Sequence, residues 1–268
     1  MDSTAPTGAD RARQLGVTVS EILCVLGTLV GVGLLGGTRV EESSGGALAA
    51  DATLVAPAGP AFSIWSVIYL GLAAYTVWQW LPAQATDERH RRTGWLAATS
   101  MLLNAAWLLV TQQGWIWASV VVIAALAAVL GVLVRRLTER PSYGFAEAVV
   151  VDGTFGAYLG WVCVATCANV TAALVASGVD PGPPVSELWA VALLAVAAGV
   201  GVLLARRLGG RYAVALALAW GLVWIAVGRV TDQPRSGVTA AAAVVAAVVV
   251  VTAAAQVRLR AVDRVGAA

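Results

Sequence analysis

The sequence predicts an all-α, polytopic helical membrane protein with about eight transmembrane helices. Apolar residues make up 59% of its 268 residues and charged residues only 12%. Several uninterrupted apolar runs reach about 18–22 residues, which is enough for a helix to cross a hydrocarbon core of roughly 30 Å. The high alanine and valine content speaks against a β-barrel, whose strands would alternate polar and apolar residues. A soluble chain of this length could not hide so many apolar runs, so we expect the protein to lie in the lipid bilayer.

The sequence contains eight apolar runs that are predicted to be spans. The runs fall at 17–37, 61–82, 94–112, 115–134, 155–177, 187–205, 212–229 and 238–257. We interpret the first run as a retained span, because Glu21 and the long glycine-rich stretch fit poorly with a removable signal. Residues 1–16 and 259–268 are then polar tails. The brief connection Thr111–Gly114 predicts that the third and fourth spans form a tight antiparallel pair.

The arginines predict the orientation in the membrane, since the chain contains no lysine. With eight spans and the N-terminus inside, fourteen of the 17 basic residues fall on the inner side. The remaining three, Arg39, Arg229 and Arg235, fall outside. The positive-inside rule therefore predicts that both termini are cytoplasmic. We expect the membrane to be a bacterial cell membrane.

Glycines in the first span indicate close contact with another helix. Gly27 and Gly31 form a Gly-x-x-x-Gly pattern, which lets a second helix approach closely, either within the chain or from a second copy. The overlapping Gly31-Val-Gly33-Leu-Leu-Gly36 spells a dinucleotide-binding fingerprint. We reject that interpretation because no strand precedes it and it lies in a membrane span.

An aromatic stripe opens the second span. Phe62, Trp65 and Tyr69 are spaced i, i+3 and i+7, so a helix places them on one face, and Pro60 suits its first turn. The preceding polar segment, residues 38–59, is either a mobile cover over a cavity or an unstructured spacer.

Two asparagines inside spans mark either helix contacts or a binding site, because polar groups are costly in a bilayer. Asn104 shares a helical face with Trp107, and Asn169 shares one with Trp161. The amides could bond each other or a backbone carbonyl, for about 0.6–2 kcal/mol each. Alternatively, amides and tryptophans line a pocket for a flat, mostly apolar ligand.

Few residues suggest catalysis or metal binding. Cys24, Cys163 and Cys167 lie in apolar runs and are expected to be packing residues, and His90 to be solvated at the membrane edge. No catalytic triad or metal-ligand spacing is present, so we expect no catalytic residue, no metal ligand and no nucleic-acid partner. Glu147 and Asp152, five residues apart, should not share a helical face. We expect them to pair with Arg135, Arg136 or Arg140; the alternative is a proton relay. We find no mid-depth carboxylate that would support a proton-driven carrier.

Three motifs resemble the TspO/MBR family of translocator proteins and tryptophan-rich sensory proteins. They are Pro-x-Phe-x-x-Trp-x-x-x-Tyr, Leu-Asn-x-x-Trp and Tyr-Leu-x-Trp-Val-x-x-Ala-x-x-x-Asn, in family order on the second, third and fifth spans. The matching residues are Pro60, Phe62, Trp65, Tyr69, Leu103, Asn104, Trp107, Tyr158, Leu159, Trp161, Val162, Ala165 and Asn169. Taken together these motifs are specific, and they suggest a divergent, longer branch of the family.

The resemblance implies a five-helix core with a ligand cavity that opens toward the loop between the first two helices. It implies a receptor or transport role, a tetrapyrrole such as a porphyrin or a sterol as ligand, and frequent dimerisation. Carried over, the ligand-binding residues are Phe62, Trp65, Tyr69, Asn104, Trp107, Trp161 and Asn169. The family's Trp-x-Pro-Pro before the second helix is reduced here to Pro57 and Pro60.

The sequence thus predicts a tail at 1–16, a TspO-like core at 17–179, three further spans at 180–258 and a tail at 259–268. The further spans, which carry Trp189, Tyr212, Trp220 and Trp224, either pack on the core as a scaffold or replace its dimer partner. The main functional hypothesis is a membrane protein that binds a hydrophobic planar ligand. The alternatives are a transporter of such compounds and an enzyme that modifies a bound tetrapyrrole.

Overall fold

The computed structural model describes residues 5–179 and 181–266, apart from the side chains of 262 and 264–266. In this part of the chain, eight helices are long and apolar enough to cross a membrane, which confirms the predicted fold class. They are α1 (Gly8–Gly31), α2 (Ile64–Trp78) together with the preceding η2 (Gly59–Ser63), α4 (Glu88–Gln112), α5 (Ile116–Glu139), α7 (Thr154–Ala176) together with the preceding α6 (Phe145–Glu147) and η3 (Ala148–Gly153), α8 (Val185–Arg207), α9 (Tyr212–Thr231) and α10 (Gly237–Gly266). Shorter elements are η1 (Ser43–Gly46) and α3 (Pro82–Ala85), and the π-helical η3 continues into α7.

The first helix begins earlier than the apolar run indicates. Residues 8–16, predicted as tail, form its first turns, and Thr7 and Asp10 form a capping box at its start. Arg13 donates to the carbonyl of Ala85 at 2.8 Å, and Gln14 exchanges hydrogen bonds with Gln79. These polar side chains are buried against protein, so hydropathy alone missed this part of the helix. Residues 1–4, 180 and 267–268 of the predicted divisions lie outside the described residues.

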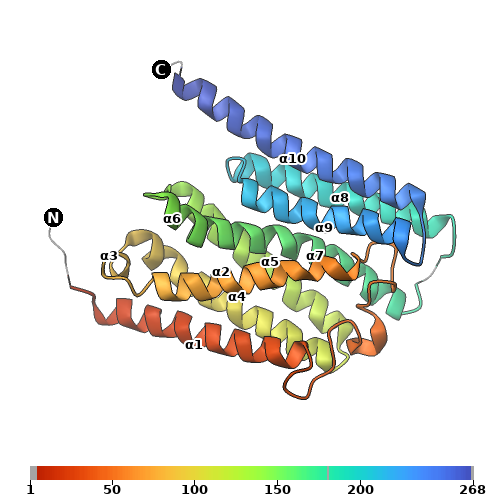
Figure 1. Cartoon of the computed structure of the whole chain (residues 1–268), viewed down its shortest axis with the longest axis horizontal. Coiled ribbons are helices and arrows are strands. Elements are labelled where there is room, and N and C mark those ends of the chain that lie inside the picture. Colours follow the sequence, from red (N-terminus) through yellow and green to blue (C-terminus); the bar gives the residue numbers. More distant parts are fainter. Residues whose placement is uncertain (1–4, 180, 267–268) are drawn as a thin grey trace.

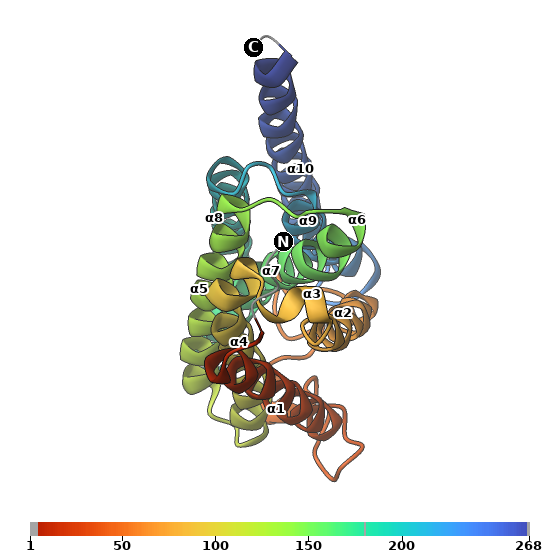
Figure 2. The ribbon, with the colours of Figure 1, turned by 90° about the vertical axis from the view of Figure 1, so that its left-hand side faces the viewer.

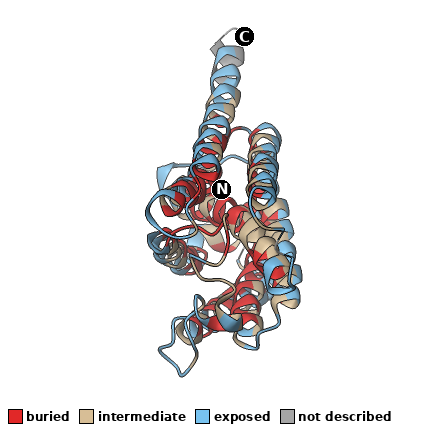
Figure 3. Cartoon of the chain, turned by 90° about the vertical axis from the view of Figure 1, so that its right-hand side faces the viewer, coloured by how far each residue is buried: buried red, intermediate tan, exposed pale blue. Residues whose placement is uncertain are grey.

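The helices form successive layers (Figure 1). α1 packs on α4 at one side, α5 and α7 lie in the middle with α2, and α8, α9 and α10 cover the far side of α7. The end of α10 extends beyond the other helices (Figure 2). Buried residues concentrate between the helices, whereas outward faces are exposed (Figure 3). Apolar side chains such as Leu70, at 74% exposure, lie on these outward faces, as expected for contact with lipid.

Both ends of the described chain lie at the same end of the bundle, as an even number of spans requires (Figure 1). We call this the termini end. Residues 38–59 connect α1 to α2 at the opposite end, which we call the loop end.

Close helix contacts depend on small residues. A Cβ added at Gly27 would lie 3.1 Å from the Cβ of Ala105, so the glycine pattern of α1 serves a contact with α4 of the same chain. On α7, a Cβ at Gly160 would lie 2.2 Å from the carbonyl oxygen of Val214 in α9. The second contact brings α9 close to the first five spans.

We expect Gly160→Ala to destabilise the protein by about 1–3 kcal/mol, because the methyl group forces α7 and α9 apart. The matched control is Gly199→Ala on α8, where an added Cβ meets nothing within 4 Å. The control should be neutral or slightly stabilising, since alanine favours helix over glycine. Free energies of unfolding in detergent would check this; equal values for both variants would contradict the tight contact.

Candidate ligand cavity

Aromatic side chains from α2 and α7 form one cluster. The ring of Phe62 meets that of Trp161 edge-on, with centroids 5.7 Å apart. Trp65 stacks on Tyr69 at 5.3 Å and meets Trp161 edge-on at 6.1 Å. These are the preferred aromatic geometries. The predicted stripe of α2 therefore faces α7 and not lipid, and Pro60 lies in the first turn as expected.

Asn104 joins this cluster to α1. Its amide nitrogen donates to the hydroxyl of Tyr69 at 3.0 Å and contacts the sulfur of Cys24 at 3.4 Å. Its amide oxygen is buried without a hydrogen-bond partner among the described residues. The side chain therefore links three helices.

Asn169 forms a second polar link, between α4, α5 and α7. The indole nitrogen of Trp107 donates to its oxygen at 2.8 Å, and its nitrogen donates to the hydroxyl of Ser119 at 2.9 Å. The two asparagines thus bond other side chains and not each other. Sequence reasoning missed Ser119, whose hydroxyl is unremarkable in an apolar run.

A small cavity lies beside the second link, at the loop end. Its volume is about 50 Å³. It is bounded by Val40, Ala47, Leu48, Ala49, Thr53, Ala56, Pro57, Phe62, Trp107, Ala165, Ala168, Asn169 and Ala172. Three of the seven predicted ligand-binding residues, Phe62, Trp107 and Asn169, therefore line it directly. The other four do not line it. Trp161 lies behind Phe62, and Trp65, Tyr69 and Asn104 follow through contacts with one another.

The segment 38–59 covers this cavity and is ordered by contacts at both of its ends. Thr38 exchanges hydrogen bonds with Gln112 at the end of α4, and Ser44 donates to the carbonyl of Thr111 at 3.0 Å. Between these contacts and Ala50, Gly45 and Gly46 have positive φ, and an added Cβ at either would meet nothing within 4 Å. The segment is thus an ordered cover, and not an unstructured spacer.

The other end of the cover is held by α9. Arg229 is 1% exposed and donates to the carbonyls of Ala50 at 3.0 Å and Thr53 at 2.9 Å. The backbone of Ala58 donates to the carbonyl of Trp224 at 3.1 Å, and the indole of Trp220 donates to the carbonyl of Ala61 at 2.9 Å. Sequence reasoning counted Arg229 only toward orientation. Its position at the end of an apolar run was the signal that it is buried.

Buried ion pairs fix the termini end. Arg89 pairs with Glu147 and with Asp152, the latter at 2.8 Å, and Arg211 pairs with Asp152 at 2.8 Å. The two carboxylates are ion-paired as predicted, but with different arginines. The prediction that they occupy different faces is wrong, because Ala148–Gly153 is π-helical and residues five apart align in such a turn.

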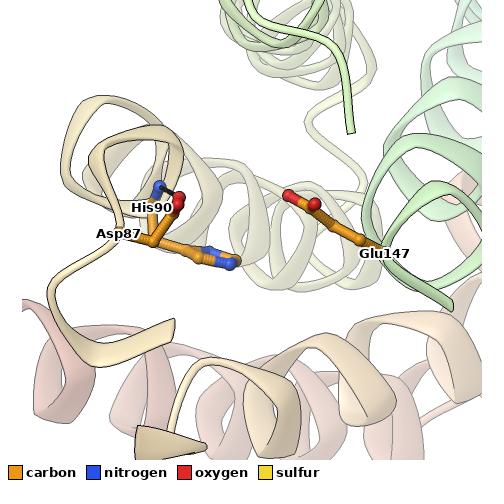
Figure 4. Close-up of side chains that lie close together, drawn as sticks. All are labelled: Asp87, His90 and Glu147. Atoms are coloured by element: carbon orange, nitrogen blue, oxygen red, sulfur yellow. Dashed lines mark hydrogen bonds between the residues drawn. The ribbon is translucent and has the colours of Figure 1, made fainter. Parts of the chain in front are cut away.

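His90 is buried beside these pairs, contrary to the prediction that it is solvated. It is 1% exposed, and one ring nitrogen lies 3.1 Å from the side-chain oxygen of Gln84. Asp87, His90 and Glu147 bring potential metal-ligand atoms within 4.8 Å of one another (Figure 4). However, Asp87 caps α4 and Glu147 is paired with Arg89, whose charge opposes a cation there. We therefore interpret this group as structural.

Comparison with known proteins gives one match. A family model described as TSPO-like protein matches residues 18–255, from α1 into α10. No curated protein and no solved structure matched the chain significantly.

We expect Arg229→Gln to loosen the cover, because a charged donor to three backbone carbonyls is lost. Each such bond contributes about 1.5–3 kcal/mol, so amide exchange in residues 50–58 should accelerate at least tenfold. Arg235→Gln, at an exposed arginine nearby, is the matched control. Hydrogen-exchange mass spectrometry would measure both; unchanged exchange in Arg229→Gln would show that the arginine does not hold the segment.

We expect Asp152→Asn to cost about 3–5 kcal/mol of stability, since two buried or half-buried guanidinium groups lose a partner. Glu139→Gln, which breaks the exposed pair with Arg92, should cost less than about 1 kcal/mol. Unfolding in detergent would compare them, and similar costs would refute the structural role of the buried pairs.

Proposed function

Because the chain belongs to the TSPO-like protein family and has eight helices suited to a bilayer, we propose that it binds a flat hydrophobic ligand in the cavity beneath residues 38–59. The ligand class is a tetrapyrrole such as a porphyrin, or a sterol. The observation that carries this proposal is the cavity itself, where the cover meets Phe62, Trp107 and Asn169. With both termini cytoplasmic, the cavity opens toward the outer face of the membrane.

The lining has the chemistry that such a ligand requires. Aromatic and small apolar side chains predominate, and they suit a planar apolar molecule. Thr53 lines the cavity, and its hydroxyl is buried without a hydrogen-bond partner among the described residues. The indole nitrogen of Trp161, behind Phe62, is likewise buried without one. A few unsatisfied polar groups in an apolar pocket are the usual means of orienting a ligand.

The size of the cavity implies that it opens for the ligand. At about 50 Å³ it holds a few water molecules, whereas pockets for drug-sized ligands measure about 300–1,000 Å³. The part of the cover between Gly45 and Ala50 lies between the hydrogen bonds that Ser44 and Ala50 make to the helices, and it supplies Ala47, Leu48 and Ala49 to the lining. We therefore assign these residues as the part that moves.

In this proposal, residues 17–179 form the binding core and residues 180–258 support it through α9. A sensory protein needs only binding, whereas a transporter must also release the ligand on the other side. An enzyme must change the ligand.

A titration of the purified protein with protoporphyrin IX in detergent tests binding through the absorbance of the pigment. We expect Trp107→Ala to weaken binding at least tenfold, because it removes a lining ring and leaves the oxygen of Asn169 unpaired. Trp189→Ala is the matched control, since Trp189 is 63% exposed on α8 and lies outside the lining. Equal affinities for both variants would place the ligand elsewhere.

The same protein in sealed vesicles distinguishes the roles. Accumulation of pigment inside identifies a transporter, and a changed pigment spectrum after extraction identifies an enzyme. Binding without either result supports the sensory role.

A further inference from the structure

Glu21 is a buried acid that the proposed binding function leaves unexplained. It lies on α1 and is 6% exposed, and neither carboxyl oxygen has a hydrogen-bond partner in the described part of the chain. It follows Arg13 by eight residues, which places it about 12 Å further along the helix axis. Glu21 thus lies near the middle of α1 (Gly8–Gly31), further from the start of the helix than the apolar run at 17–37 indicated.

The neighbours of Glu21 offer no positive charge. α1 and α4 run parallel, since Gly16 lies against Trp95 and Gly27 against Ala105. Glu21 therefore lies beside the stretch of α4 between Trp95 and Ala105, which contains no titratable residue. The titratable groups that interact with it are Cys24 of α1, Tyr69 of α2 and Tyr158 of α7. The short α3, which also contacts α1, carries none.

Such a place favours the neutral, protonated form of a carboxyl group. An unpaired carboxylate in a water-free site is far costlier than the neutral acid, and intramembrane acids with this environment commonly carry protons. No arginine is among the groups that interact with Glu21, and the chain contains no lysine. A proton is therefore the available means of neutralising the carboxylate.

Unpaired polar atoms lie on the helices between the level of Glu21 and the termini end. Side-chain atoms that are buried without hydrogen-bond partners include those of Arg13, Tyr75, Thr76, Gln79 and His90, on α1, α2 and α4. Their positions are linked, because the rings of Tyr75 and His90 are 5.7 Å apart and Gln79 bonds α1 through Gln14. Buried polar atoms of this kind bind ordered water, and a water chain conducts protons.

On its other side Glu21 adjoins the aromatic wall. Tyr69, with which it interacts, stacks on Trp65 and accepts a hydrogen bond from Asn104. A ligand that lifts the cover and extends past Phe62 into the bundle also displaces this wall. Such a displacement admits water to Glu21, and water stabilises the carboxylate.

We propose that Glu21 is a proton-binding site within the membrane that releases its proton when the ligand enters the cavity. The O–H bond of the carboxyl group breaks, the electron pair stays on the carboxylate, and the proton passes to water in the route toward the termini end. This coupling rests on the proposed ligand-binding function. Its physiological use is proton-linked binding or movement of a hydrophobic planar molecule.

The coupling of proton release to ligand binding fixes the direction in which affinity changes with pH. Because binding releases a proton, affinity must rise as pH rises, by up to tenfold per pH unit if one full proton is released. Glu21→Gln keeps the shape of the neutral acid but has no proton to release, so its affinity should not depend on pH. Glu88→Gln, at an exposed carboxyl in the first turn of α4, is the matched control and should behave as wild type.

The experiment uses the full-length protein in detergent and protoporphyrin IX dimethyl ester, which has no free carboxyl group of its own. Its dissociation constant is measured from pH 6 to 8 for the wild type, Glu21→Gln and Glu88→Gln. In parallel, infrared spectra of the ligand-free proteins at pH 7 are compared between the wild type and each variant. They detect the carbonyl band of a protonated carboxyl group. We expect that band in the wild type and in Glu88→Gln, and its loss in Glu21→Gln.

Each outcome decides the proposal. Steeper pH dependence in the wild type than in Glu21→Gln, together with the infrared band, supports it. If the band is absent from the wild type, or if both proteins bind with the same pH dependence, the proton site or its coupling is refuted while the binding function stands. If the ester and protoporphyrin IX both fail to bind, the proposed function fails and the coupling with it.

Discussion

The absence of water in the bilayer is the constraint on which this structure depends, because every polar group within the spans must find a partner inside the protein. The observed links obey it: Asn169 bonds Trp107 and Ser119, and Arg229 bonds three backbone carbonyls. Each link joins segments that are distant in sequence. The same constraint makes unpaired groups conspicuous, among them the hydroxyl of Thr53 beside the cavity and the carboxyl group of Glu21 on α1.

The three C-terminal spans take part in shaping the candidate site. α9 contacts α7 through Gly160 and holds the cover through Arg229 and the backbone of Trp224. α8 and α10 pack with each other, and α10 packs on α9, on the side away from the cavity. The match to the family model also extends across these helices. The sequence-based alternatives were a scaffold and a substitute for a dimer partner, and the contacts of α9 favour the scaffold.

Much of the fold could be predicted because hydropathy and helix length follow directly from the bilayer. The eight spans, the tight turn after α4 and the inward face of Phe62, Trp65 and Tyr69 all have local signals in the sequence. The hydropathy pattern gave no signal for the early start of α1, because Arg13 and Gln14 are polar yet bond other segments of the protein. The shared face of Glu147 and Asp152 depends on a π-helical turn, which residue spacing does not reveal. The burial of Glu21 depends on how α1 rotates against α4, and this rotation is set by contacts between distant segments.

We propose that a flat hydrophobic ligand occupies the space between the cover and the faces of Trp107 and Asn169. An experimental structure of the protein with protoporphyrin IX bound would test this most directly. We expect the pigment at that position, with residues 45–50 displaced outward and the contacts of Arg229 intact. Pigment bound only on outward faces, such as that of α8, with the cover still closed would contradict it.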